Sequence, residues 1–315
     1  MTRKLGSSGI AVGPVGLGCM GMTHAYDASQ RDEAESIRVI HRALDLGATL
    51  IDTSDVYGPH TNEVLVGKAL AGRRDDAVLA TKCGLVAVDG GAMTRDGRPD
   101  YVKAACEASL TRLGVDHIDL YQLHRVDPGV PVQDTWGAFA DLVAAGKVRA
   151  IGLSEATVAE IELCHTIHPV ASVQSELSLW TRDWTEDVLP WCRANDVAYL
   201  AFSPLGRGFL TGSIAADRPF EDGDFRAGLP RFQPESLAAN QGLVDAVRAV
   251  AARIGATPGQ VALAWALAQA QQVVPIPGTK RVSRLEENVA AAALVLSADD
   301  LAELDALPAP VGTRY

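Results

Sequence analysis

The sequence has 315 residues, of which 48% are hydrophobic and 21% charged, and its formal net charge is −11 at pH 7. This acidic balance argues against nucleic acid and anionic membranes as partners, because both are bound through broad basic surfaces. No apolar run approaches the roughly 20 residues of a membrane helix, and the start, MTRKLGSSGI, does not have the pattern of a secretory signal. Five scattered cysteines without a C-x-x-C pair predict reduced thiols and a cytoplasmic protein.

Short apolar runs alternate along the chain with longer segments of helical period, which is the pattern of repeated βα units. Eight runs predict strands, at 15–20, 49–52, 77–82, 118–124, 148–154, 171–175, 198–203 and 273–277. Near-continuous apolar strands are typical of a parallel sheet covered by helices. Eight such units predict an α/β fold, a closed (β/α)8 TIM barrel with a short N-terminal β-hairpin and extra helices. Since no linker or low-complexity tract divides the chain, we expect one domain over residues 1–315.

The helical segments have recognisable ends. The first begins at Ser29 or Asp32, either of which can cap it, and ends at Gly47. Further helices are predicted at 61–71, 100–113, 132–145, 157–166, 186–195, 234–254, 257–270, 281–293 and 297–306. The glycine-rich stretch VDGGAMTRDGRPD (88–100) predicts an inserted loop.

Residues 16–21 read GLGCMG, which has the glycine spacing of a dinucleotide-binding turn. In that fold the third glycine opens a helix, and an acidic residue about 20 positions on binds the ribose. Here MTHAYDASQRD intervenes before any helical period, and Asp45 falls inside a predicted helix. The sequence therefore favours another interpretation, in which Gly16 and Gly18 let the first strand lie close to other backbone or to a ligand.

Four titratable residues stand at or just after the ends of neighbouring predicted strands. Asp52 ends the second strand, Tyr57 follows it, Lys82 ends the third strand and His124 ends the fourth. Each alone is more often structural, but the carboxyl ends of barrel strands are where chemistry takes place, so we expect the four to converge. Lys82 would favour the phenolate of Tyr57, and Asp52 would keep Lys82 charged. His124 could hold a substrate oxygen, so the set predicts acid catalysis without a metal or a nucleophile.

The motifs together resemble the aldo-keto reductases, which are NAD(P)H-dependent carbonyl reductases on a βα barrel. The resemblance covers nearly the whole chain and rests on GLGCMG, DTSDVYG, ATK, LHR, GLSE, QSE, SPLGRGFLTG and PIPGTKRVSRLEEN, in the order of the family. The nearest patterns are the pyridoxal-reductase-like and potassium-channel-β-like subgroups. The resemblance implies Tyr57 as the general acid, Lys82 and Asp52 as the residues that tune it, and His124 as the residue that orients the carbonyl. The implied reaction reduces a small aldehyde or ketone to an alcohol with the pro-R hydride of NADPH.

The resemblance also implies an extended cofactor across the barrel mouth. Ser154 and Gln174 would contact the nicotinamide carboxamide, and Phe202 would stack beneath the ring. The SPLGRG loop would close over the pyrophosphate, and the cations after the eighth strand would bind a 2′-phosphate, which favours NADPH over NADH. The cofactor-binding residues implied in this way are Gly18, Cys19, Met20, Ser154, Gln174, Phe202, Ser203, Pro204, Leu205, Gly206, Gly208, Gly278, Thr279, Lys280, Arg284, Glu287 and Asn288.

One position departs from the family pattern. Glu155 stands where many relatives have asparagine, and an ionised carboxylate accepts hydrogen bonds but cannot donate one to the carboxamide oxygen. The substrate would be selected by the loops at 125–131 and 205–235, with Trp180 and Trp184 nearby, and the short PAPVGTRY ending predicts a less covered pocket.

Two alternatives accompany this interpretation. CHTIH (164–168) has histidine and cysteine but lacks a second ligand pair, so no metal site is predicted there. The β subunits of voltage-gated potassium channels resemble the same family, and the alternative function is accordingly a regulatory or redox-sensing barrel that binds the cofactor with little turnover.

Overall fold

The computed structural model describes residues 2–88, 92–214 and 220–315. Its central sheet is parallel, with strand order β12-β11-β10-β9-β8-β5-β4-β3. The eight strands are β3 (Leu17–Gly18), β4 (Leu50–Asp52), β5 (Val78–Cys83), β8 (Ile118–Leu123), β9 (Val148–Ser154), β10 (Ser172–Glu176), β11 (Ala198–Phe202) and β12 (Val273–Pro275). Each predicted run overlaps one of them, which confirms the predicted barrel.

The sheet closes on itself where β3 meets the segment after β12. Gly18 pairs with Gly278 in a parallel bridge, and the backbone nitrogen of Gly16 donates to the carbonyl oxygen of Pro275 at 2.9 Å. A Cβ atom on Gly18 would lie 2.9 Å from the carbonyl oxygen of Ile276, so the approach requires glycine. This confirms that GLGCMG brings the first strand close to other backbone.

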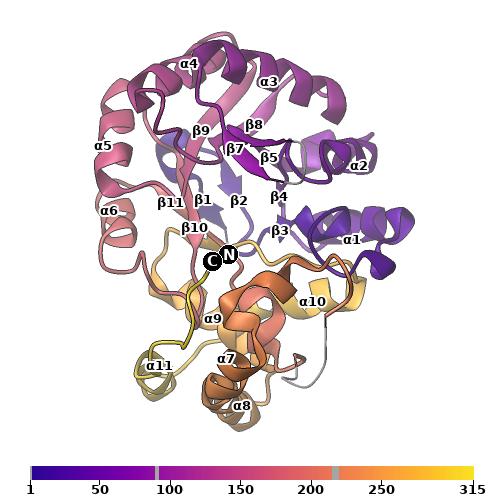
Figure 1. Ribbon diagram of the computed structural model, residues 1–315, viewed down its shortest axis with the longest axis vertical. Coiled ribbons are helices and arrows are strands. Elements are labelled where there is room, and N and C mark those ends of the chain that lie inside the picture. Colours follow the sequence, from indigo (N-terminus) through magenta and orange to yellow (C-terminus); the bar gives the residue numbers. More distant parts are fainter. Residues whose placement is uncertain (1, 89–91, 215–219) are drawn as a thin grey trace.

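Helices surround the strands as a ring, which Figure 1 shows. They are α1 (Glu33–Asp45), α2 (Thr61–Leu70), α3 (Pro99–Leu113), α4 (Val132–Ala144), α5 (Val158–Ile167), α6 (Val188–Ala194), α9 (Pro258–Gln269) and α10 (Val282–Ala290). Asp32, and not Ser29, caps α1 by accepting from the Glu35 nitrogen at 2.9 Å. A short 3-10 helix over Met20–Met22 begins within the glycine motif, and the next α-helix starts only at Glu33, so the long helix of a dinucleotide fingerprint does not follow the motif.

Three further helices lie outside this ring, namely α7 (Pro234–Ala239), α8 (Gln241–Ile254) and α11 (Ala298–Asp305). The prediction of one continuous helix over 234–254 is wrong because α7 and α8 meet at Asn240. The Asn240 amide donates to the Val311 carbonyl at 3.0 Å and accepts from its nitrogen at 2.8 Å. The junction is thus tied to a segment distant in sequence, and Asn240 itself is neither glycine nor proline.

The stretch predicted as a loop over 88–100 contains part of a hairpin. β7 (Met93–Arg95) pairs antiparallel with β6 (Leu85–Ala87), and residues 89–91 lie outside the described residues. The loop prediction is wrong for 93–95 because all three side chains are exposed, so that no apolar alternation marks the strand. The predicted helix 281–293 likewise ends earlier, at Ala290, and Ala291–Ala293 form a 3-10 turn.

The amino-terminal end of the barrel is plugged. The hairpin of β1 (Arg3–Lys4) and β2 (Ala11–Val12) precedes the barrel strands. Its side chains Leu5, Ile10 and Val12 form one buried apolar cluster with strand residues of the barrel interior. The site is therefore left to the opposite end, where the strands have their carboxyl termini.

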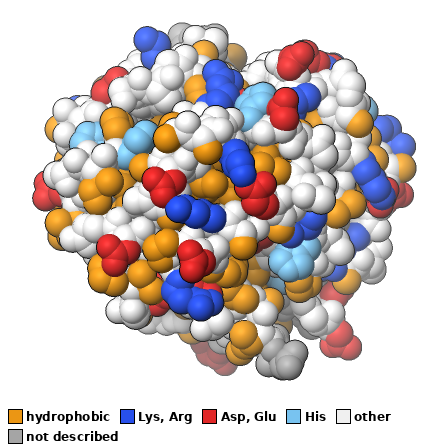
Figure 2. Space-filling model, turned by 90° about the horizontal axis from the view of Figure 1, so that it is seen from above, with side chains coloured by type: hydrophobic (Ala, Val, Ile, Leu, Met, Phe, Trp, Pro, Cys, Tyr) orange, Lys and Arg blue, Asp and Glu red, His pale blue; other side chains and the backbone are white. Residues whose placement is uncertain are grey.

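The surface and the cysteines agree with the composition. On the face displayed in Figure 2, acidic and basic side chains lie side by side with apolar ones among them. All five cysteines are free and buried. Within the described residues, no helix combines the length and the apolar character needed to cross a membrane.

Candidate active site

The carboxyl ends of three adjacent strands bring the four predicted catalytic residues together. β4 pairs with β5 and β5 with β8, which places Asp52, Lys82 and His124 beside one another, while Tyr57 reaches them from the loop after β4. The Lys82 Nζ atom lies 2.6 Å from Asp52 Oδ1 and 3.4 Å from the Tyr57 hydroxyl. The rings of Tyr57 and His124 meet edge to face with centroids 5.9 Å apart.

Lys82 is a buried cation behind the tyrosine. Its side chain is fully buried and also donates to the Thr53 carbonyl at 2.8 Å. Burial by itself lowers the pKa of Lys82, but the charge of Asp52 and the contact with Tyr57 raise it above its ordinary value, so the ammonium form is held. Loss of Asp52 would leave an unpaired buried charge, which costs about 3 to 5 kcal/mol.

Asp52 is fixed by two amides from the barrel interior. Gln174 Nε2 donates to Asp52 Oδ2 at 2.8 Å, and Gln122 Nε2 lies 3.4 Å from the same oxygen. The sequence interpretation assigned Gln174 to the cofactor and did not single out Gln122. Since Gln174 also lines the cavity, its amide nitrogen holds Asp52 while its carbonyl oxygen remains for a ligand.

The protonation states of Tyr57 and His124 follow mainly from burial. Burial raises the pKa of Tyr57, and this effect outweighs the lowering by the Lys82 charge. The Lys82 charge thus acts in the expected direction but does not offset burial, and Tyr57 holds its proton at neutral pH. Burial, together with the charges of Lys82 and Arg125, places the pKa of His124 well below its usual value, so the imidazole is neutral.

The four residues adjoin a cavity of about 830 Å³ at the barrel mouth. Asp52, Tyr57 and His124 line it, whereas Lys82 lies behind its wall. Most of the predicted cofactor residues also line it, namely Gly18, Met20, Ser154, Gln174, Phe202, Ser203, Pro204, Leu205, Gly208, Gly278, Thr279, Lys280, Arg284, Glu287 and Asn288.

Two predicted cofactor residues do not line the cavity. Cys19 is fully buried, with its Sγ atom 4.0 Å from the Leu17 carbonyl. Gly206 faces away from the cavity, since a Cβ atom there would lie 2.9 Å from the ring of Trp180. Trp180 therefore packs behind the loop, and neither it nor Trp184 is among the lining residues.

The SPLGRG loop has a backbone suited to an anion. Ser203, Gly206, Arg207 and Gly208 all have positive φ, at 48°, 56°, 53° and 98°. Such left-handed residues curve the chain so that backbone N–H groups can converge on an anion. The non-glycine Arg207 is held in this conformation by its buried side chain, whose Nη2 atom lies 2.9 Å from Glu176 Oε2.

The charges around the cavity favour an anionic ligand. Among the described lining residues there are six cations and four carboxylates. The cations are Arg125, Arg207, Arg226, Lys280, Arg281 and Arg284, and the carboxylates are Asp27, Asp52, Glu221 and Glu287. In a protein of net charge −11, such a local excess of cations is suited to an anionic ligand, although Arg207 and Arg226 are also paired with Glu176 and Asp224.

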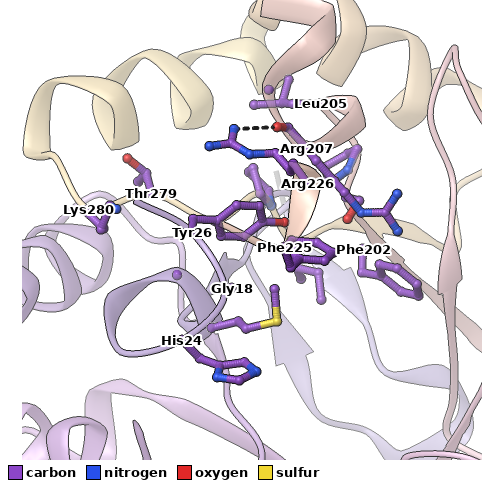
Figure 3. Close-up of a pocket in the computed structure, with 18 of the residues that line it drawn as sticks. Gly18, His24, Tyr26, Phe202, Leu205, Arg207, Phe225, Arg226, Thr279 and Lys280 are labelled. Carbon is purple, nitrogen blue, oxygen red and sulfur yellow. Dashed lines mark hydrogen bonds between the residues drawn. The ribbon is translucent and has the colours of Figure 1, made fainter. Parts of the chain in front are cut away.

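The loop that carries Tyr26 and the loop that carries Phe225 and Arg226 meet across the cavity. The sequence analysis did not predict this contact. Figure 3 shows Tyr26, Phe225 and Arg226 together at the centre of the pocket. The Arg226 guanidinium lies 5.0 Å from the Tyr26 ring centroid and donates to Asp27 Oδ1 at 3.1 Å. Lys280 donates to the Asp27 carbonyl at 3.0 Å. No local pattern marks these residues, because their contact depends on how the loops fold.

The PAPVGTRY segment also reaches the site. Tyr315 lines the cavity, and Arg207 Nη2 donates to its hydroxyl at 3.0 Å. The segment thus supplies part of the cavity wall. CHTIH, in contrast, lies apart, with His165 Nδ1 accepting from the Val170 nitrogen at 3.2 Å. Over residues 2–88, 92–214 and 220–315, no group of three or more His, Cys, Asp or Glu side chains is arranged to hold a metal ion.

The chain is thus a parallel α/β barrel in which a buried Asp-Lys pair lies behind a tyrosine at the wall of a cation-rich cavity. The model of the Aldo/keto reductase family matches residues 14–309, and the chain belongs to this family.

Solved structures agree with this assignment. This chain is similar to a glycerol dehydrogenase from Gluconobacter oxydans, with 29% sequence identity and a TM-score of 0.86. The match covers 96% of this chain and 94% of the dehydrogenase chain. An aldo-keto reductase from Bacillus halodurans in its holo form has 28% identity and a TM-score of 0.76, with coverage of 96% and 95%. An aldo/keto reductase from Klebsiella pneumoniae in complex with NADP and acetate has 27% identity and a TM-score of 0.76, with coverage of 99% and 97%.

Proposed function

We propose that this protein is an NADPH-dependent aldo/keto reductase that converts small aldehydes or ketones to alcohols. The proposal rests chiefly on the chain of contacts from Asp52 through Lys82 to Tyr57, at 2.6 and 3.4 Å, which ends at the cavity wall. The family assignment and the NADP complex of the Klebsiella pneumoniae relative support it. We also propose that residues 1–315 act as one domain, since a single sheet draws its strands from residues 17 to 275.

The residues present fit a dinucleotide phosphate. The cavity of about 830 Å³ is large enough for an extended ligand, and its cations exceed its carboxylates. NADPH, when bound, supplies the hydride. Thr279, Lys280 and Arg284 would hold its 2′-phosphate, and the positive-φ loop from Ser203 to Gly208 would hold its pyrophosphate. Phe202 would offer its ring face to the nicotinamide, Ser154 and Gln174 would bind the carboxamide, and Glu287 and Asn288 would contact the adenine.

In this proposal Tyr57 acts as the general acid. Its raised pKa keeps the phenol protonated until an alkoxide forms at the substrate, whose basicity then draws the proton away. The phenolic O–H bond breaks, the O–H bond of the alcohol forms, and the resulting tyrosinate lies next to the Lys82 ammonium, which stabilises it. His124 would hold the carbonyl oxygen, and solvent that enters through the cavity would return the proton to Tyr57.

A cofactor and substrate panel tests the proposal. Purified protein is mixed with NADPH or NADH and with short aliphatic, aromatic and sugar-derived aldehydes, simple ketones and pyridoxal, and oxidation of the nicotinamide is followed by absorbance. We expect turnover with several carbonyls and a preference for NADPH. Tight binding of NADPH without turnover across the whole panel would contradict the proposal and would favour a cofactor-sensing barrel.

A further inference from the structure

The hydroxyl of Ser54 lies between the imidazole of His124 and a buried carboxyl group. Ser54 Oγ is 3.1 Å from His124 Nδ1 and 3.2 Å from Asp55 Oδ1. All three side chains are buried, with Ser54 at 0%, Asp55 at 3% and His124 at 7% exposure. The proposed reaction uses His124 but neither of the other two. The contacts form a hydrogen-bonded chain from a carboxyl group behind the barrel wall to a ring that lines the cavity.

Proton counting gives this chain two arrangements. The Ser54 hydroxyl has one proton and can donate it in one direction only. Its third neighbour, the Lys82 carbonyl oxygen, lies 3.5 Å away, which is longer than the other two contacts and beyond the usual length of an O–H···O hydrogen bond. When Asp55 is ionised, Ser54 donates to it and accepts from His124, so the ring proton is on Nδ1 and Nε2 carries a lone pair. When Asp55 is protonated and donates to Ser54, the serine donates to Nδ1, and the ring proton is on Nε2. Nε2 makes no hydrogen bond to any side chain or backbone group that the structure describes, which leaves it for a ligand.

We propose that Ser54 and Asp55 are positioning residues that set the tautomer of His124 and thereby decide whether Nε2 donates to, or accepts from, the substrate oxygen. This inference rests on the proposed function, because it assigns the substrate oxygen to His124. With Nε2–H present, the ring can donate to a carbonyl oxygen, as reduction requires. With Nε2 unprotonated, it can accept from the hydroxyl of an alcohol, as the reverse oxidation requires.

The conversion between the two arrangements balances. A proton that reaches Nε2 from the cavity allows the Nδ1 proton to pass to Ser54 Oγ, and the hydroxyl proton of Ser54 then passes to Asp55. One proton is taken up in all. The imidazole is neutral before and after, and the added proton neutralises the Asp55 carboxylate. Ser54→Ala would interrupt this relay without touching the carboxyl group or the ring.

The surroundings of Asp55 place its titration in the neutral range. Burial, and after it the charge of Glu63, raise the pKa of Asp55 to about 7, although the Ser54 hydrogen bond and the Arg112 charge lower it. Glu63 itself is paired with Arg112 at 2.6 Å. The titratable and charged groups that face the relay are Glu63 on α2, Tyr101 and Arg112 on α3, Cys83 on β5 and Tyr121 on β8 at Asp55, and Lys82, Arg125 and Tyr57 at His124.

Nitrogen NMR of the free protein tests the tautomer directly. Protein labelled with ¹⁵N-histidine is titrated across the interval around pH 7, and His124 is assigned among the seven histidines with the His124→Gln variant. We expect the ring proton to move from Nε2 to Nδ1 as the pH rises. Ser54→Ala should abolish the movement and Ser54→Thr should keep it. Ser172→Ala, which removes a buried barrel hydroxyl without a partner among the described residues, should leave it unchanged.

A constant His124 tautomer in the wild type, or the same transition in Ser54→Ala, would overturn the inference. Because this measurement needs neither cofactor nor turnover, its failure is separate from a failure of the proposed reductase activity.

Kinetics provide the second readout. Above about pH 7, kcat/KM for carbonyl reduction should fall about tenfold per pH unit in the wild type. In the same protein, kcat/KM for alcohol oxidation should rise up to about pH 7 and level off above it. Ser54→Ala should lower reduction by about 10- to 100-fold and remove this inflection, and Ser54→Thr should restore both. An unchanged inflection in Ser54→Ala would contradict the relay even if the activity were reduced.

Discussion

Arg314 forms an ion pair with Glu155 at the end of β9, with Arg314 Nη1 3.1 Å from Glu155 Oε1 and Nη2 in contact with the other carboxylate oxygen. Both side chains are largely buried, at 16% and 7% exposure. Glu155 has φ of +52° and its Oε1 atom also accepts from the Glu176 nitrogen at 3.1 Å. The acidic residue that departs from the family pattern is thus neutralised by a residue 159 positions away in sequence.

We expect Arg314→Gln to change the balance between the two cofactor forms. Glu155 follows Ser154, which the proposal places at the nicotinamide, and an unpaired carboxylate there would attract the cationic ring of NADP⁺ but not the neutral ring of NADPH. At an effective dielectric constant near 20, such a charge is worth about 1 to 2 kcal/mol. The Kd ratio of NADPH to NADP⁺, measured by fluorescence titration, should therefore rise about tenfold.

The matched control is the double variant Glu155→Gln/Arg314→Gln, which removes both charges and should return the ratio to the wild-type value. Equal weakening of both cofactor forms in Arg314→Gln would show that the ion pair has a structural role only.

Arg284→Ala should separate NADPH from NADH. Arg284 is exposed and lines the cavity after β12, where the proposal places the 2′-phosphate. A charge-assisted contact of this kind is worth about 1.5 to 3 kcal/mol, so the Kd for NADPH should rise about 10- to 100-fold with little change for NADH. Arg193→Ala, an exposed arginine in the last turn of α6 that does not line the cavity, is the control. Similar losses for both cofactors would contradict the assignment.

Asp55→Asn should stabilise the protein at alkaline pH. Burial raises the pKa of Asp55 in the folded protein to about 7, well above the ordinary value of an aspartate in the unfolded chain, so the folded protein binds this proton more tightly. The free energy of unfolding therefore falls between about pH 4 and about pH 7, by about 4 kcal/mol in total, and levels off above that range. Chemical denaturation is measured about one pH unit below and one unit above pH 7. The free energy of unfolding of the variant, relative to that of the wild type, should be greater at the higher pH.

The variant Asp119→Asn is the control, because it removes a buried carboxylate that is paired with cations. Asp119 is also buried, but it is paired with Arg74 at 2.8 Å and Arg149 at 2.6 Å, so its loss should destabilise the protein by about 1 to 3 kcal/mol. If Asp55→Asn destabilised the protein to the same extent at both pH values, the pKa of the Asp55 carboxyl group would not be raised by burial as described above.

The barrel could be predicted from sequence because its strands are buried on both faces. Continuous apolar runs follow directly from such burial, and each of the eight runs overlaps a strand. β7 was missed because Met93, Thr94 and Arg95 are all exposed and carry no periodic signal. The break between α7 and α8 was missed because Asn240 is fixed by Val311, a contact that no local pattern reveals.

The site likewise has residues that the sequence predicts and residues that it does not. Asp52, Lys82 and His124 could be predicted because each lies at or next to the carboxyl end of a strand, and strand ends of a barrel converge by topology. Arg226, Arg314 and the other loop residues could not, since their positions depend on the folding of long segments against each other. At Gly206 the need for glycine comes from the ring of Trp180 behind the loop, since a Cβ atom there would lie 2.9 Å from it.

The Tyr57→Phe variant tests the central claim, that Tyr57 gives its proton to the substrate oxygen. Wild type and variant are loaded with NADPH, mixed with the best carbonyl of the panel, and followed through a single turnover, with NADPH deuterated at the transferred position to identify the hydride step. Loss of a general acid should slow this turnover by about 10²-fold or more, while the Kd for NADPH changes by less than about twofold, because the ring is retained. A turnover rate close to that of the wild type would contradict the account.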